Sequence, residues 1–130
     1  MFLILIFYGN VFAESKDKDT KLSQLFEQLK KSNNVSTALE IEIKIWNIWS
    51  THPTQKQLTQ SLVKGSDLIS KGELEAAYKI FSIIINSDPD WVEGWNKRAT
   101  VLYLMGRYED SLSDIDEVLK RESRHFGALS

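Results

Sequence analysis

Apolar side chains recur every three or four residues over most of the chain beyond position 20, the spacing that places them on one face of an α-helix. The first such helix is predicted over residues 20–31, with Thr20 as its cap, and the polar residues 32–34 end it. Its buried face is expected to consist of Leu22, Leu25, Phe26 and Leu29.

The next segment, residues 37–49, fits two patterns. Leu39, Ile41 and Ile43 alternate with polar residues, as in a strand, but a helical face is also present. We predict a helix, because the chain holds no second strand candidate and an unpaired strand leaves its backbone polar groups unsatisfied. Thr37 and Glu40 have the spacing of a capping box at its start. The predicted helical face is Ala38, Ile41, Ile45, Ile48 and Trp49, and Pro53 closes the segment.

The second half of the chain repeats itself at a fixed interval, which is the distance along the chain from Gly72 to Gly106. A shift by that interval also superimposes Phe81 on Ile115, and no gap is needed between positions 58 and 124. Each unit contains two amphipathic helices that meet at a glycine. The predicted helices are 58–71 and 74–86 in the first unit, and 91–105 and 108–121 in the second.

These residues resemble the tetratricopeptide repeat, a helix–turn–helix unit of about 34 residues. The chain departs from the family pattern at Ser61 and Lys64 in the first unit and at Arg98, Ser111 and Ser123 in the second. The resemblance implies an all-α fold, an α-solenoid of antiparallel helix pairs with two good repeats behind a degenerate N-terminal pair. The overall pattern is similar to small secreted tetratricopeptide-repeat proteins of Gram-negative bacteria. The matching positions are Gly65, Leu68, Gly72, Ala77, Phe81 and Pro89, then Trp95, Ala99, Leu102, Gly106 and Tyr108.

Several of these positions have a physical reason. Gly65 and Ala99 are small where two helices of one unit should cross, and Gly72 and Gly106 end the first helix of each unit. Trp95 is expected to pack between the helices of its unit. Trp91 is expected at the joint between units, where Asp90 caps the following helix together with Glu93; a ligand cage built from Trp91 and Trp95 is the alternative.

The first thirteen residues carry no charge and are followed abruptly by a charged stretch. The small residues Val11 and Ala13 resemble a secretory cleavage site, so we expect cleavage before Glu14 and a periplasmic or secreted protein. A membrane anchor or a buried N-terminal element are the alternatives. The predicted organisation is a signal peptide at 1–13, a linker at 14–19, a degenerate helical pair or N-terminal cap at 20–57, repeats at 58–91 and 92–125, and the start of a truncated third repeat at 126–130.

The composition of the chain argues against several kinds of binding and catalytic site. The net charge of −2 shows no basic excess of the kind that nucleic-acid binders carry, and the absence of cysteine excludes disulfides, thiolate nucleophiles and cysteine zinc sites. The acidic residues 114–117 are interpreted as a solvated helix face, with Asp114 and Glu117 beside Asp110. The basic cluster at 120–125 suits a helix C-terminus. We therefore predict no catalytic, cofactor-binding or metal-binding residues, His125 included, and a protein that is not an enzyme.

The family resemblance implies a groove on the concave side that binds a protein or peptide partner. Leu62 and Ser66 stand where chaperone-binding members carry lysine and asparagine, which argues against an acidic C-terminal tail as ligand. Asn96 and Tyr103 are expected to be exposed. The implied groove residues are Thr59, Leu62, Ser66, Ile69 and Ser70, then Glu93, Asn96, Thr100, Tyr103 and Leu104.

The end of the chain predicts an incomplete solenoid. Residues 126–130 start like the first helix of another unit, while Leu112 and Ile115 are expected to cover Trp95, and Val118 and Leu119 are expected to need a following helix. The chain is then a fragment of a longer protein, or a partner or second copy covers that face. An accessory part of a longer protein or enzyme, or a self-associating structural module, are therefore the alternatives to an interaction scaffold.

Overall fold

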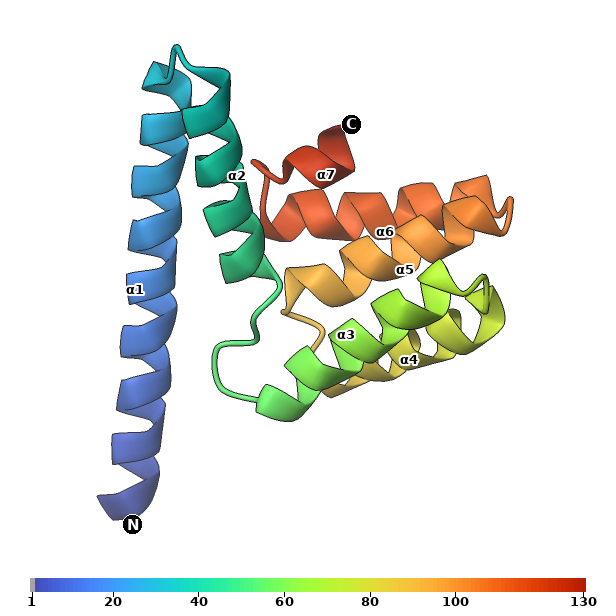
Figure 1. Cartoon of the computed structure of the whole chain (residues 1–130). Helices are drawn as coiled ribbons and strands as arrows, with labels where there is room; N and C mark the ends of the chain where they lie inside the picture. Colours follow the sequence, from blue (N-terminus) through green and yellow to red (C-terminus); the bar gives the residue numbers. More distant parts are fainter. Residues whose placement is uncertain (1) are drawn as a thin grey trace. The chain divides into compact units, whose positions relative to one another are not determined.

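The computed structural model describes the backbone of residues 2–130 and the side chains from Lys16 onward. These residues form seven helices and, over the described range, no strand (Figure 1). They divide into two compact units, residues 1–56 and 57–130. The predicted all-α fold is confirmed, and so is the helical interpretation of residues 37–49.

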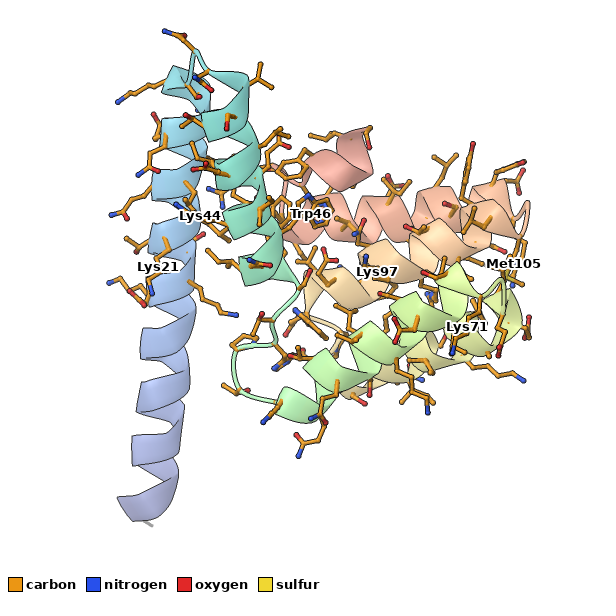
Figure 2. The ribbon with its side chains drawn as sticks, viewed as in Figure 1. Lys21, Lys44, Trp46, Lys71, Lys97 and Met105 are labelled. Carbon is orange, nitrogen blue, oxygen red and sulfur yellow. The ribbon has the colours of Figure 1, made fainter. Side chains whose placement is uncertain are left out.

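The first unit consists of α1 (Phe2–Lys31) and α2 (Val35–Trp49), which pack against each other. Leu22 is buried on α1, and the ring of Phe26 lies 6.0 Å from the ring of Trp49. Trp46, labelled in Figure 2, meets Trp49 edge-on at 5.4 Å. On α2 the buried residues are Ile41, Ile45 and Trp49, every fourth position of the predicted face.

The caps of this unit differ from those predicted. Asn34, and not Thr37, caps α2: its backbone is extended, and its side chain accepts hydrogen bonds from the N–H groups of Ser36 and Thr37 at 2.8 and 3.2 Å. Thr20 lies inside α1, where its hydroxyl donates to the carbonyl of Lys16. The amide side chain of Asn34 therefore caps α2 three residues before the predicted threonine.

α1 is continuous through residues 14–19, which were expected to be a linker, so this stretch is helical. Met1 lies outside the described residues, and cleavage before Glu14 remains a prediction. Among the described residues, no helix combines the length and the apolar content that crossing a membrane requires.

The second unit contains two complete helix pairs. The first pair is α3 (Lys56–Ser70) with α4 (Leu74–Ser87), and the second is α5 (Val92–Leu104) with α6 (Tyr108–Arg121). A last turn, α7 (Phe126–Leu129), begins one full repeat period after the start of α5. The predicted bounds of the four long helices are met within two residues, so the repeat period is a property of the folded chain.

Three glycines fix this repeat. Gly72 and Gly106 have φ angles of 74° and 76°, so the turn inside each pair uses the left-handed conformation that glycine adopts at little cost. Gly65 lies where α3 crosses α4: a Cβ atom there would stand 2.5 Å from Cε1 of Phe81. The predicted close crossing is confirmed.

The core of the second unit joins the first pair to α5. α5 packs against α4, and a Cβ atom on Gly94 would lie only 3.0 Å from Cγ2 of Ile84. Met105, labelled in Figure 2 at the end of α5, packs on the same core. The buried cluster consists of Leu58, Leu62, Ala77, Phe81, Ile84, Trp91 and Val101.

Candidate partner-binding surface

The predicted groove residues separate into exposed and buried sets. Tyr103 and Leu104 are 62% and 50% exposed, and Thr100 on α5 and Ser70 on α3 are also exposed. Leu62, Glu93 and Asn96 are buried. The expected exposure of Asn96 is therefore wrong, while that of Tyr103 is confirmed. Thr59, Ser66 and Ile69 are half-buried.

Asn96 is buried because it belongs to a polar network at the joint before α7. The Glu93 carboxylate and Nε2 of His125 are 2.7 Å apart, and both side chains are fully buried. The Asn96 amide donates to both oxygens of Glu93, at 3.3 and 3.2 Å. A carboxylate is costly to bury without such partners, so the network accounts for three polar residues in an otherwise apolar region.

This network corrects the capping box predicted at the start of α5. Trp91 is the N-cap residue, and no side chain caps the helix there, so Asp90 and Glu93 do not form a capping box. Glu93 instead points to His125, the residue before α7. Trp91 and His125 are one repeat period apart, so the same repeat position holds a buried indole at one joint and a buried imidazole at the next.

An open groove of about 530 Å³ lies between α5 and α6 and reaches α7. Three predicted groove residues, Asn96, Thr100 and Tyr103, form its α5 side. Sequence reasoning missed the α6 side, where Tyr108, Leu112 and Ile115 form a stripe at helical spacing. The remaining lining residues are Ala99, Ser111, Gly127 and Ser130.

Two expectations about α6 are reversed by its packing. Leu112, expected to cover Trp95, is 61% exposed and lines the groove instead. Val118, expected to need a following helix, is fully buried. The uncovered apolar surface of α6 therefore lies toward its N-terminal half, and not toward its C-terminal end.

Asp114 was expected on a solvated helix face. Its carboxylate is instead buried and forms an ion pair. Its two oxygens accept hydrogen bonds from Nε and Nη2 of Arg98 at 2.7 and 2.9 Å, and Arg98 also donates to the hydroxyl of Ser82 on α4. The hydrogen bond to Asp114 raises the pKa of Arg98 above its ordinary value. Arg98, a departure from the family pattern, thus ties α5 to both neighbouring helices.

The two tryptophans of the joint have structural partners. Trp91 is 8% exposed and belongs to the core, as predicted. Trp95 donates its indole N–H to the carbonyl of Pro89, and the guanidinium groups of Arg98 and Arg121 lie over its ring at 5.3 and 4.9 Å. The cations over the Trp95 ring are thus arginines of the protein itself, and the two tryptophans are packed at the joint between the repeats.

The basic cluster at the end of α6 is paired with acids of the same chain. Arg121 binds Glu117 at 2.7 Å and Arg124 binds Glu122 at 2.7 Å. The pKa of Glu117 is lowered by its hydrogen bonds with Arg121 and Lys120. Burial alone would raise the pKa of Glu122, but hydrogen bonds from Arg124 bring it below its ordinary value. Among the described side chains, no three histidine, aspartate or glutamate residues gather as a metal site requires.

Comparison with known proteins places these repeats in context. The chain is 39% identical over 128 residues to a TPR repeat-containing protein of Rhizobium etli, which covers 93% of this chain and 61% of that protein. It is 28% identical over 129 residues to a DnaJ homolog subfamily C member 7 homolog of Schizosaccharomyces pombe, over 96% of this chain and 25% of that protein. The chain thus spans less than two thirds of either relative. No family model matches, and no solved structure matches.

Proposed function

We propose, on the premise that this chain is a tetratricopeptide-repeat protein, that it is a non-catalytic scaffold that binds a segment of a partner protein on the inner faces of α3 and α5. The premise rests on the repeat register of the helices and on the similarity to a TPR repeat-containing protein. Proteins built from such repeats generally act in protein interaction, because stacked helix pairs form an extended concave surface.

The observation that carries the proposal is the exposure of Tyr103 and Leu104 beside exposed hydroxyl groups. Tyr103 and Leu104 are 62% and 50% exposed, and Ser70 of α3 and Thr100 of α5 are exposed as well. Tyrosine combines a large apolar ring with a polar hydroxyl and is enriched at protein interfaces. A surface of this composition suits a peptide that offers both apolar side chains and backbone hydrogen-bonding groups.

The proposal is tested by capture of partners from an extract of the source cells on the immobilised full chain. Ser70→Arg and Leu104→Arg place bulky charges on the inner faces at positions outside the lining of the α5–α6 groove. We expect both variants to lose the captured partner, and Ile83→Arg, at a 62% exposed position of α4, to retain it. Equal capture by all variants would show that the inner faces of α3 and α5 do not bind the captured partner.

We further propose that the protein is exported and acts in the periplasm or outside the cell, after cleavage before Glu14. The support is the uncharged run 1–13, followed by a charged stretch. The mass of the protein recovered from its source cells is expected to correspond to a chain that begins at Glu14. A soluble cytoplasmic chain that retains Met1 would contradict the proposal.

A further inference from the structure

A short loop connects the two units of the chain, and a histidine side chain holds its conformation. α2 ends at Trp49, α3 begins at Lys56, and the first unit ends at the same lysine (Figure 1). Within this loop His52 is only 6% exposed. Its ring atom Nδ1 accepts hydrogen bonds from the backbone N–H groups of Thr54 and Gln55, at 3.2 and 2.9 Å. The imidazole therefore fixes the turn that leads into α3.

These hydrogen bonds define the protonation state of the ring. A backbone N–H group can only donate, so Nδ1 must accept with its lone pair and carry no proton. The proton of the neutral ring is then on Nε2. Pro53 follows His52 and has no N–H group, so the next two amides are the first that can donate to the imidazole. A protonated imidazole donates from both nitrogens and cannot accept these hydrogen bonds.

The turn between α1 and α2 is held in the same way by a group that does not titrate. The side chain of Asn34 accepts hydrogen bonds from the N–H groups of Ser36 and Thr37, at 2.8 and 3.2 Å. In both turns the side chain thus binds the amides two and three residues further along the chain. The asparagine oxygen accepts in neutral and in mildly acidic solution, whereas Nδ1 of His52 accepts only while it is unprotonated. Acid should therefore affect the loop before α3 and leave the turn before α2 intact.

Two cations adjoin the loop. Nζ of Lys18 on α1 donates to the carbonyl of Thr51 at 2.6 Å, and Lys56 is the first residue of α3. The N-terminus of a helix also carries a partial positive charge. Residues 50–57 include no aspartate or glutamate. Protonation of His52 consequently removes two hydrogen bonds and adds a positive charge near two others, and both effects favour an open loop in which the ring is hydrated.

We propose that His52 makes the connection between the two units sensitive to pH: the loop keeps its turn while Nδ1 is unprotonated and opens in mildly acidic solution, which allows the units to move relative to each other. Histidine is the side chain that ordinarily changes its charge between about pH 5 and 8. Because the turn requires the neutral ring, its stability is present above this range and is lost as the pH falls through it. The inference concerns the connection between the units and does not depend on the partner of the proposed function.

The first measurement follows the ring and the loop together, by NMR of the full chain between about pH 8 and about pH 5. We expect the nitrogen resonance of Nδ1 to be that of an unprotonated atom at the higher pH. The amide resonances of Thr54 and Gln55 should then shift with the same midpoint as the ring resonances of His52. The chain has two histidines, so the signals that disappear in His52→Asn are those of His52.

The second measurement follows the two units by fluorescence energy transfer between single molecules. The chain has no cysteine, so Gln24→Cys and Asn86→Cys, both at exposed positions, place one label in each unit. Acid should broaden the distribution of transfer efficiencies in this labelled chain. The additional change His52→Asn keeps an acceptor of the kind seen at Asn34 and should give the narrow distribution at both pH values. His52→Ala removes the acceptor and should give the broad distribution at both.

Three outcomes would overturn the proposal. If Nδ1 takes up a proton while the amide resonances of Thr54 and Gln55 stay in place, the ring does not hold the loop. A ring that remains unprotonated down to about pH 5 would not respond to mild acid. An equal response of His52→Asn and the unmodified chain to acid, in the transfer measurement, would assign the change to another group, such as His125.

Discussion

The two helix pairs of the second unit are built on one register but end differently. The groove of the first pair is covered by α5 over its length, and its joint is sealed by the apolar Trp91 and by Gly94, which approaches Ile84 closely. The groove of the second pair meets only the single turn of α7, which is held through the buried Glu93–His125 pair. The same repeat position is thus occupied by the indole of Trp91 at the first joint and by the imidazole of His125 at the second. The indole packs in the core, and the imidazole holds the short helix α7.

The two grooves differ in how far their apolar residues are covered. Phe81 of the first pair is fully buried in the core, whereas Tyr108 and Leu112 of the second pair are 58% and 61% exposed. The polar pair holds the start of α7 in place without extending the apolar core across the groove.

The largest expected effect is a difference in the loss of stability caused by leucine at two equivalent repeat positions, Gly65 and Ala99. Gly65→Leu should destabilise the chain by about 3 kcal/mol, because even a Cβ atom there meets the ring of Phe81. Ala99 is also buried at 4% exposure, but it already carries a Cβ atom and borders the groove, so Ala99→Leu should cost less, about 1–2 kcal/mol. Urea denaturation of both variants measures the difference. Equal losses would show that the two grooves are equally packed.

The next effect concerns Arg98, which bridges both pairs. Arg98→Ala leaves the buried carboxylate of Asp114 without its guanidinium and should cost about 2–3 kcal/mol. Arg107→Ala, which removes a largely exposed pair with Asp110, should leave the denaturation midpoint nearly unchanged. The midpoints of urea denaturation compare the two. A similar small loss for both would mean that the Arg98–Asp114 pair carries no special share of the stability.

Loss of the buried imidazole should have a smaller and more local effect. His125→Ala removes the partner of Glu93, but α7 is short and can detach, so that Glu93 regains water at a cost of about 1–2 kcal/mol. Limited proteolysis should then cleave near residues 122–130 much faster than in the unmodified chain. Arg124→Ala is the control, and equal cleavage of both variants would contradict a specific role of the buried pair.

The smallest expected effect is a pH dependence at the same joint. The pKa of Glu122 is lowered from 4.5 in the folded chain, so its pairing with Arg124 stabilises the fold above that pH and is lost as the pH falls below it, through the folded-state pKa. Glu122→Gln should therefore flatten the loss of thermal stability in this acidic range and change little near neutral pH. If thermal stability falls with decreasing pH equally in Glu122→Gln and the unmodified chain, Glu122 does not contribute to the acid sensitivity of the fold.

The sequence predicted the repeat better than it predicted the site. The glycines at 65, 72 and 106 and the apolar periodicity act locally, so the helices and their crossings follow from residue spacing alone. The burial of Asn96 and Asp114 depends on His125 and Arg98, which lie several helical turns away in the chain and on other elements. Spacing on one helix does not reveal such partners. The exposure of Leu112 likewise depends on how far α7 extends over α6.

The most direct test of the account is hydrogen–deuterium exchange measured on α4 and α6 in the full chain. α4 lies under α5, while α6 lies beneath the open groove, so the amides of α6 should exchange faster than those of α4 in the free protein. Equal protection of the two helices would contradict the central claim that the groove of the first pair is covered by α5 while the residues of the second groove are more exposed.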